Sequence, residues 1–169
     1  METARFRLAR LDDLDQIMAI IKDAKVFMAS QNSGQWQDQH PRKETIAHDI
    51  ESSNYYVIEE NGCVLAGMAL LGYEPDYDQP LEGAWISSGP YLVIHRLAVA
   101  KQHHGRGLGA QMLKQAENIA KAKHIVSVRL DTHHRNTPMV RLLEKCGYTR
   151  IGAVLLTNFK RRIAFEKII

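Results

Sequence analysis

The stretch YLVIHRLAVAKQHHGRGLGA, residues 91–110, decides the fold of this chain. Residues 91–100 are mostly apolar, as in a strand of a buried sheet. A polar segment with glycines at 105, 107 and 109 follows, and it opens a helix predicted to run from about residue 106 to residue 123. Glycines let backbone N–H groups approach an anion closely, and a helix N-terminus adds unpaired donors and partial positive charge. The stretch therefore predicts a strand, a turn suited to a pyrophosphate, and a helix.

On both sides of this stretch, hydrophobic periodicity predicts alternating strands and helices. The predicted strands are residues 3–9, 55–60, 63–73, 91–100, 125–131, 148–156 and 159–168. The predicted helices are one that ends near Ser30, a short one with Pro41 in its first turn, residues 106–123 and residues 137–145. The order β-α-α-β-β-β-α-β-α-β-β predicts an α/β fold, a mixed sheet with helices on its faces, in a single domain over residues 1–169.

The composition is that of an ordinary globular protein. Hydrophobic residues make up 45% and charged residues 24%, so long disorder is excluded. No apolar run approaches the roughly 18 residues of a membrane helix, and no secretory signal is apparent. The net charge of +3 is mild, and no motif predicts a nucleic-acid partner. Two cysteines outside any C-x-x-C pair favour a cytoplasmic protein without a disulfide framework.

Two nucleotide-binding patterns compete for the glycine stretch. A P-loop needs Gly-Lys-Ser/Thr after its last glycine, which is absent here. A dinucleotide fold matches Gly105-x-Gly107-x-x-Ala110, with Asp131 in the place of the ribose ligand. Its turn should follow the strand at once, however, whereas residues 100–104 intervene. The dinucleotide fold stays open as an alternative.

Two segments together resemble the signatures of the GNAT superfamily of N-acyltransferases. HGRGLGA, residues 104–110, preceded by Leu-Ala-Val at 97–99, is similar to its acyl-CoA motif. NTPMVRLLEKCGY, residues 136–148, is similar to its second signature, at the expected distance. The resemblance implies a GNAT-like fold with a splayed central parallel pair of strands, and an acetyl-CoA-dependent N-acetyltransferase.

The resemblance also implies where acetyl-CoA, the acyl donor, binds. Its pantetheine arm would pair with the exposed backbone of the first splayed strand, and its pyrophosphate would lie in the glycine turn. The residues implied are Leu97, Ala98, Val99, His104, Gly105, Arg106, Gly107, Leu108, Gly109, Ala110, Asn136, Met139 and Leu142. His104 stands where the family usually has Gln or Arg.

One family feature is missing. Many members carry a tyrosine that protonates the leaving thiolate, and the matching position here is Leu143. Tyr148 is a catalytic candidate, although it takes the place of an aromatic residue that usually packs in the core. The general acid is therefore unassigned.

The implied reaction is direct attack of a neutral amine on the thioester, with a backbone N–H of residues 97–99 as the oxyanion donor. His95 is the candidate base, because it precedes the motif by two residues and an imidazole titrates near neutral pH. We expect it to share a strand face with Val93 and Leu97. A purely structural histidine is the alternative. Arg96 should face the other way, as a surface or interface ion-pair residue.

Covalent and metal chemistry are not favoured. Cys63 and Cys146 have no histidine at a diagnostic spacing, so small buried residues are the better interpretation. The adjacent His133 and His134 lack a third ligand at a suitable spacing, so no metal site is predicted.

In the family, the acceptor enters between two loops, which here are residues 31–41 and 157–161. Trp36 and Asn158 are the candidate substrate-binding residues, with the basic run 160–162 nearby. An acidic loop, residues 74–82, would raise the local amine concentration if it folds over the cleft. A solvated loop is the alternative.

The leading acceptor is a small primary amine or an amino-acid-like molecule. The alternatives are a peptide or protein amine, or a non-catalytic acyl-CoA sensor, which the leucine at position 143 favours. Dimers are common in the superfamily, so the resemblance leaves a homodimer open.

Overall fold

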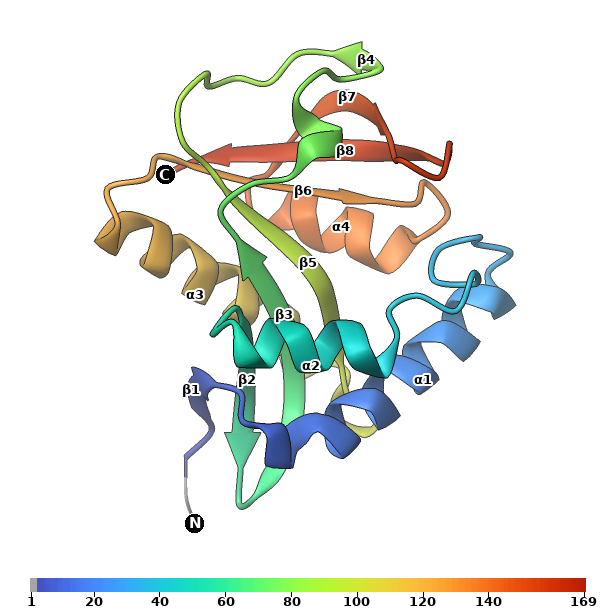
Figure 1. Ribbon diagram of the computed structural model, residues 1–169, viewed down its shortest axis with the longest axis vertical. Helices are drawn as coiled ribbons and strands as arrows, with labels where there is room; N and C mark the ends of the chain where they lie inside the picture. Colours follow the sequence, from blue (N-terminus) through green and yellow to red (C-terminus); the bar gives the residue numbers. More distant parts are fainter. Residues whose placement is uncertain (1–2) are drawn as a thin grey trace.

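A computed structural model describes residues 3–169 of the protein (Figure 1). The helices are α1 Leu14–Ser30, α2 Lys43–Glu51, α3 Leu108–Ala122 and α4 Thr137–Lys145. The strands are β1 Arg5–Leu8, β2 Tyr55–Glu60, β3 Cys63–Leu71, β4 Glu82–Gly83, β5 Leu92–Val99, β6 Ser127–Thr132, β7 Thr149–Leu155 and β8 Arg161–Ile168. Short 3-10 turns lie at η1 Leu11–Asp13, η2 Pro75–Tyr77 and η3 Lys101–His103. The predicted α/β order is confirmed, with the two-residue β4 and the 3-10 turns added.

The strands form one mixed sheet in the order β1-β2-β3-β5-β6-β8-β7-β4. Within residues 3–169, β5 and β6 are the parallel pair, and the other neighbouring strands run antiparallel. A dinucleotide-binding fold needs a mainly parallel, doubly wound sheet. The observed order therefore rules out that alternative.

Each face of the sheet is covered by two helices, as the apolar stripes of those helices require. Ile17 and Ile21 of α1 and Ile46 of α2 pack in one buried cluster with residues of β2, β3 and β5. Met112 of α3 and Leu143 of α4 pack in a second cluster on the opposite face. In Figure 1, α2 crosses in front of β3 while α3 passes behind it. No helix in residues 3–169 has the length and apolar character to cross a membrane.

The parallel strands β5 and β6 separate soon after they meet. They pair only at Leu92 with Val128 and at Val93 with Arg129. Beyond Val93, the edge of β5 that faces β6 has no strand partner in the described part of the chain. This is the predicted splayed pair, and it leaves backbone donors and acceptors available to an extended ligand.

A β-bulge at Arg96 changes which way the side chains of β5 face. Between two successive pairs with β3, β5 carries one residue more than β3, and Arg96 has a φ of 57°. His95 lies on the side of Val93, whereas Leu97 packs with Ile94 in the opposite cluster. The expectation that His95 and Leu97 share a face is therefore wrong, because a bulge interrupts the alternation of side chains.

Most predicted boundaries agree with the structure to within about two residues. Pro41 was expected in the first turn of α2, but α2 begins at Lys43 with Arg42 as its N-cap. α3 begins at Leu108 because Gly107, its N-cap, adopts a left-handed φ of 75° that ends the preceding turn.

Candidate functional site

A long groove follows the splayed strand and the glycine turn. We call it the glycine-loop groove; its volume is about 620 Å³. It is lined on one side by α1, on another by β5 and the turn, and on the third by α4. Twelve of the thirteen residues implied to bind acetyl-CoA line it: Leu97, Ala98, Val99, His104, Gly105, Gly107, Leu108, Gly109, Ala110, Asn136, Met139 and Leu142.

The glycine turn has the shape of an anion cradle. Gly105 and Gly107 adopt φ of 84° and 75°, which glycine reaches without strain. The first hydrogen bond of α3 runs from the N–H of Gln111 to the carbonyl of Gly107, so the N–H groups of residues 108–110 precede it. A Cβ on Gly109 would lie 2.8 Å from Cδ2 of Leu142. A Cβ on Gly105 or Gly107 would instead meet no heavy atom within 4 Å, so the turn is open at these two glycines. A pyrophosphate could reach the main chain there, and the residues present fit coenzyme A.

The side chain of Arg106 does not line the groove. Its guanidinium donates to both carboxylate oxygens of Glu60, over 2.9 and 3.2 Å, and lies 3.1 Å from Nδ1 of His103. This ion pair raises the pKa of Arg106 and lowers the pKa of Glu60. Because its donors are used on β2, a side-chain contact from Arg106 to a phosphate would require breaking this pair.

His104 has a local partner at the mouth of the groove. Its Nε2 lies 3.1 Å from the carbonyl oxygen of Val99, and since a carbonyl only accepts, Nε2 is the donor. The ring thereby joins the end of β5 to the glycine turn.

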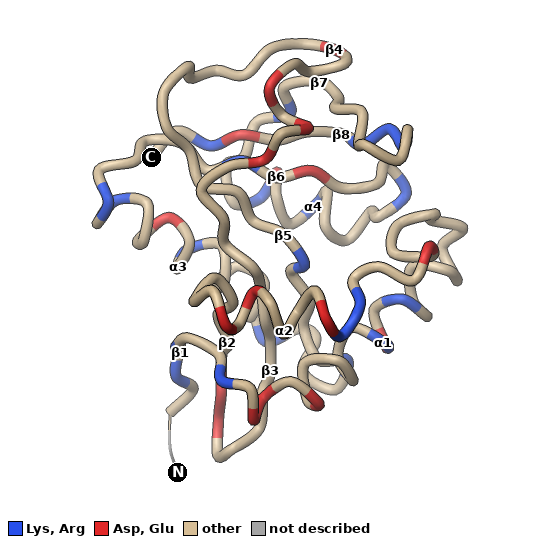
Figure 2. Tube along the Cα trace, viewed as in Figure 1, with Lys and Arg blue, Asp and Glu red and all other residues tan. Residues whose placement is uncertain are grey.

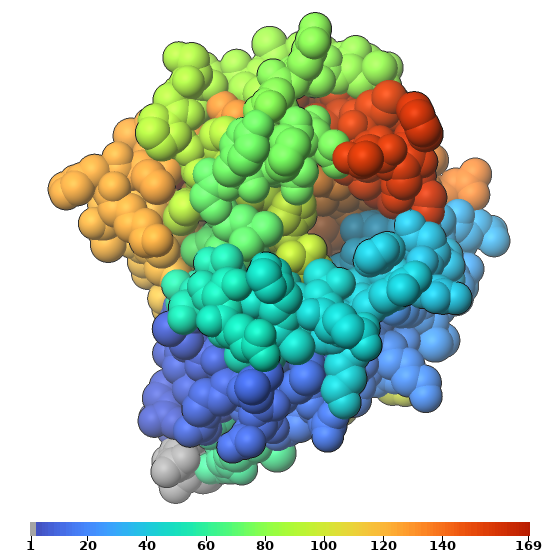
Figure 3. All heavy atoms as spheres, in the orientation of Figure 1, coloured from blue at the N-terminus to red at the C-terminus, as the bar shows by residue number. Residues whose placement is uncertain are grey.

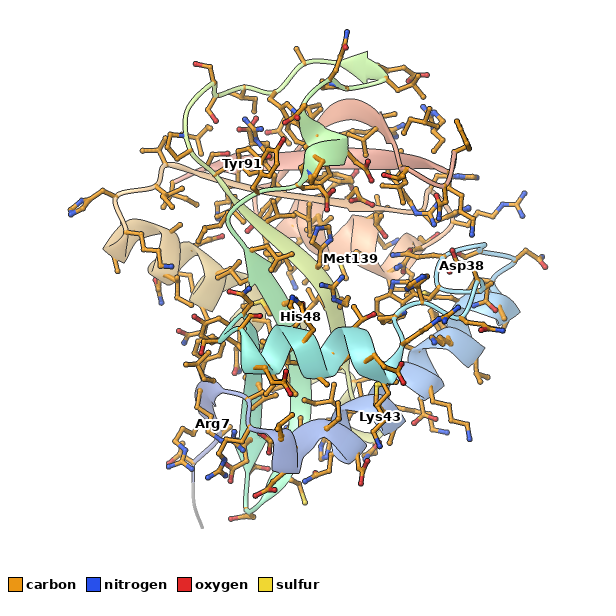
Figure 4. All side chains as sticks on the ribbon, viewed as in Figure 1. Arg7, Asp38, Lys43, His48, Tyr91 and Met139 are labelled. Carbon is orange, nitrogen blue, oxygen red and sulfur yellow. The ribbon has the colours of Figure 1, made fainter. Side chains whose placement is uncertain are left out.

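A second hollow opens at the inner end of the groove. We call it the His95 cavity; its volume is about 260 Å³. Its walls include Trp36, Glu74, His95, Asp131 and Arg162. The groove and the cavity share four lining residues: Met28, Leu97, Asn136 and Met139. Met139 lies near the centre of Figure 4. The two hollows therefore meet where a thioester at the end of the groove would face a molecule in the cavity.

His95 is hydrogen-bonded to Glu74 inside the cavity. Its Nε2 lies 2.9 Å from Oε2 of Glu74, and both side chains are largely buried. The hydrogen bond from His95 is the main cause that lowers the pKa of Glu74, against the opposing effect of burial. Glu74 therefore stays ionised near neutral pH and holds the imidazole in place.

A second carboxylate, Asp131 of β6, lines the same cavity. Oδ2 of Asp131 accepts a hydrogen bond of 2.6 Å from the hydroxyl of Tyr77, which is almost fully buried. Burial raises the pKa of Asp131, and nearby His95 and the Tyr77 hydroxyl partly offset it. The cavity thus holds two acidic groups of unequal acidity, Glu74 and Asp131.

The loop between α1 and α2 is fastened to the inner wall by Gln35. Its Oε1 accepts from Thr132 Oγ1 at 3.1 Å, from the His133 N–H at 3.2 Å and from Asn136 Nδ2 at 3.3 Å. This places Trp36, which has a φ of 61°, against the cavity. Trp36 thus lies where the sequence predicts an acceptor contact.

Asn158 holds two loops together and does not line the cavity. Its Nδ2 donates to Asp38 at 3.3 Å, and Lys160 Nζ donates to the same carboxylate oxygen at 3.2 Å. Asp38 lies on the α1–α2 loop at the edge of the molecule (Figure 4). Thr157 in turn donates from its hydroxyl to Asp76, over 2.6 Å. Instead of the predicted direct contact, Asn158 takes part in a clasp between the loops.

Three loops therefore surround the mouth of the His95 cavity. Figure 3 shows a hollow bordered by the loop before α2, the segment after β3 and the β7–β8 turn. Figure 2 shows that acidic positions gather on the segment after β3. Of these, Glu74 and Asp76 line the cavity, so this segment does fold over the cleft at its first residues.

Tyr148 lies in the core, away from both hollows. It is 4% exposed, packs in the α3–α4 cluster, and its hydroxyl has no hydrogen-bond partner in residues 3–169. Burial is the main cause that raises its pKa. Leu143, at the family's tyrosine position, is fully buried. Tyr148 is therefore placed as a packing residue rather than beside a thioester.

Neither cysteine lines the groove or the cavity. Cys63 is exposed at the β2–β3 hairpin, so its predicted burial is wrong; Cys146 is half-buried after α4. His133 and His134 stack on each other, 4.4 Å between ring centroids. Among residues 3–169, no three His, Cys, Asp or Glu side chains are grouped so as to hold a metal ion.

Several cavity residues were not predicted as site residues. Glu74 appeared only within an acidic loop, Arg162 only within a basic run, and Asp131 only as a dinucleotide ligand. Tyr77, which donates to Asp131 without lining the cavity, lies in the same acidic loop and was not singled out. The missing information is non-local, because the register of β3 with β5 and of β6 with β8 brings these residues together.

Comparison with known proteins agrees with this geometry. The model of the acetyltransferase (GNAT) family matches residues 15–148, so the chain belongs to that family and is an acetyl-CoA-dependent N-acetyltransferase. An acetyltransferase of the GNAT family from Streptococcus agalactiae is 35% identical, with a TM-score of 0.87 over 98% of this chain and 95% of that one.

More distant relatives share the same architecture. YesJ of Bacillus subtilis, described as an uncharacterised N-acetyltransferase, is 26% identical over 84% of this chain and 79% of its own. The PaiA N-acetyltransferase of Thermoplasma acidophilum, solved in complex with coenzyme A, is 16% identical, with a TM-score of 0.74 over 99% of this chain and 100% of that one. At this identity the likeness concerns the fold.

Proposed function

We propose that the chain acetylates the primary amine of a small molecule by direct attack in a ternary complex. The observation that carries the proposal is the meeting of the glycine-loop groove with the His95 cavity at Leu97, Asn136 and Met139. When bound, acetyl-CoA supplies an activated acetyl group as a thioester. The groove residues would hold it through the main chain of β5 and the glycine turn.

His95 acts as the proton acceptor. A neutral imidazole that donates from Nε2 to Glu74 carries its free lone pair on Nδ1. The hydrogen bond to Glu74 holds the ring in this tautomer and orientation, so Nδ1 is the nitrogen that accepts a proton from the amine. Glu74 is thus a positioning residue, and His95 the catalytic one.

Three observations support a small acceptor and a direct transfer. The cavity holds about 260 Å³, slightly below the roughly 300–1,000 Å³ of pockets for drug-sized ligands. The loops that border its mouth are joined by two contacts, one between Asp38 and Lys160 and one between Asp76 and Thr157. These contacts leave little room for a protein surface. Neither Cys63 nor Cys146 lines the groove or the cavity, where an acyl-cysteine would have to form.

The test measures thiol release with acetyl-CoA and a panel of small amines. Initial-rate lines that intersect as both concentrations vary support direct transfer, whereas parallel lines contradict it. His95→Ala should lower kcat by roughly 10²–10⁴-fold at saturating amine while the Kd of acetyl-CoA is unchanged. His48→Ala, exposed on α2 (Figure 4), is the matched control. An unchanged rate in His95→Ala removes the base role.

A protein that binds acetyl-CoA but never exceeds background hydrolysis with any amine would be a sensor, and this result would overturn the proposed activity. Calorimetry of acetyl-CoA binding, run beside the rate assay, separates that case from a protein that has lost its fold.

A further inference from the structure

Arg162 is a buried cation that faces the His95 cavity. It lies on β8 opposite Val154 and is 6% exposed. A guanidinium carries five N–H donors. The protein partner recorded for them is the carbonyl oxygen of the adjacent Arg161, which accepts one hydrogen bond of 3.1 Å.

Other arginines withdrawn from solvent have a carboxylate partner. Arg96 donates to Asp49 over 2.7 and 3.0 Å, and Arg129 donates to Glu166 over 3.2 Å. Within residues 3–169, no carboxylate oxygen lies within 4.0 Å of the Arg162 guanidinium. Burial lowers the pKa of Arg162, and Asp131 and Asp38 act on it only from a longer range.

An unpaired buried charge is costly unless something else balances it. Since Arg162 lines the cavity, a ligand in that cavity is the available source of the balancing charge. A planar fork of donors matches a carboxylate, which accepts two parallel hydrogen bonds. Glu74 and Asp131 line the same cavity and offer acidic groups to an ammonium or amine.

We propose that Arg162 binds the anionic group of the acceptor, and that the acceptor is a small molecule of the amino-acid type, with a carboxylate beside its amine. The inference rests on the proposed acetyl transfer, because it assigns the acceptor to the same cavity. It makes Arg162 a specificity-determining residue, distinct from the base.

The first test compares matched acceptors with the unaltered enzyme. Free amino acids, the corresponding amino-acid amides, decarboxylated amines of equal side chain and an amine bearing a phosphate are offered with acetyl-CoA. We expect kcat/KM for the best free amino acid to exceed that for its amide by roughly 10–100-fold, the range of a lost hydrogen bond to a charged group. A phosphate-bearing amine that outperforms every amino acid would overturn the carboxylate assignment.

The second test removes the charge. Arg162→Gln should raise KM for the amino acid by roughly 10–100-fold, with little change in kcat or in the rate with the decarboxylated amine. Arg162→Lys keeps the positive charge but loses the planar pair of donors. Its KM for the amino acid should lie between that of the unaltered enzyme and that of Arg162→Gln. Arg161→Gln is the control, because Arg161 is exposed and pairs with Glu82.

The outcomes separate this inference from the proposed function. If amines without a carboxylate are acetylated as well as amino acids, the Arg162 assignment is wrong and acetyl transfer stands. If no amine of any class is acetylated, the proposed function fails and the Arg162 assignment fails with it. Because the comparison of acceptors uses the unaltered enzyme, it decides the question even if the Arg162 variants do not fold.

Discussion

Arg96 donates from Nε and Nη2 to the two carboxylate oxygens of Asp49, over 2.7 and 3.0 Å, from a backbone position with a φ of 57°. Asp49 is 3% exposed on α2, and Arg96 is the extra residue of the bulge in β5. The pair therefore connects a helix to the place where the central strands separate. Arg96 was expected as a surface or interface ion-pair residue, but its partner lies within the chain.

We predict that Asp49→Asn lowers the free energy of unfolding by about 2–3 kcal/mol, because it leaves a half-buried guanidinium without its counter-charge. KM for the acceptor should rise as well, since Arg96 also lines the His95 cavity. Urea denaturation and steady-state kinetics measure the two effects. Glu51→Gln, on the exposed end of α2, is the control. If Asp49→Asn lowers the free energy of unfolding no more than Glu51→Gln does, the prediction is contradicted.

The glycine turn allows a test of the groove that does not depend on turnover. Gly109→Ala should weaken coenzyme A binding about 5–10-fold, because the new methyl group displaces the Leu142 side chain that lines the groove. When Leu142 is already replaced by alanine, Gly109→Ala should weaken coenzyme A binding much less. Calorimetry measures the Kd of coenzyme A for the unaltered protein, for each single variant and for the double variant. Gly89→Ala, where a Cβ meets open space, controls for the added methyl group. Equal losses in both backgrounds would show that Leu142 is not the obstacle.

Tyr148→Phe removes a buried hydroxyl that has no hydrogen-bond partner among the described residues, 3–169. Its removal should leave the free energy of unfolding unchanged or raise it by about 1 kcal/mol, because no hydrogen bond is lost. The rate of acetyl transfer should also be unchanged. A fall of tenfold or more in kcat, with stability intact, would instead restore Tyr148 as the acid that serves the thiolate.

Stability should decrease in acid through the ion pairs of Arg7, labelled in Figure 4. Its guanidinium donates to Asp13 over 2.7 and 2.9 Å and to Glu59 over 2.9 Å. These bonds lower the pKa of Asp13, and the hydrogen bonds from Arg7, Arg5 and Gly62 lower that of Glu59 to about 2.

Both carboxylates therefore have folded pKa values below their unfolded ones. Their contribution is fully present above about pH 4.5 and is lost as the pH falls toward 2. Melting temperatures between pH 6 and pH 2.5 should show this fall, and Arg7→Gln should show a shallower one. Arg150→Gln, which removes an exposed arginine on β7, provides the comparison. Parallel pH profiles for Arg7→Gln and the unaltered protein would contradict the assignment.

The donor side of the site was predictable because its signals are local. The residues of the glycine turn are contiguous. Asn136, the N-cap of α4, is followed at helical spacing by Met139 and Leu142. Their neighbours along the chain determine their geometry, so a pattern in the sequence is enough. Arg106 is the exception, because its direction depends on Glu60, which lies 46 positions earlier.

The acceptor side was not predictable in the same way. Glu74 and His95 are 21 positions apart, and Tyr77 and Asp131 are 54 apart. Their meeting depends on strand register and on the bulge at Arg96, which reverses the face expected from simple alternation. Trp36 lines the cavity because Gln35 fastens the loop that carries it, and its contact with an acceptor stays a prediction. Asn158 was placed in the right region, but Asp38 engages its side chain.

The two hollows are built from different parts of the polypeptide. The glycine-loop groove presents backbone and small or aliphatic groups, whereas the His95 cavity presents ionisable side chains held on separate strands. Under the proposed function, exchanges at Asp131 or Arg162 would change which amine is accepted, while the groove that holds the donor stays intact. Proteins with this scaffold would then change their acceptor specificity through a few substitutions, without altering the donor site.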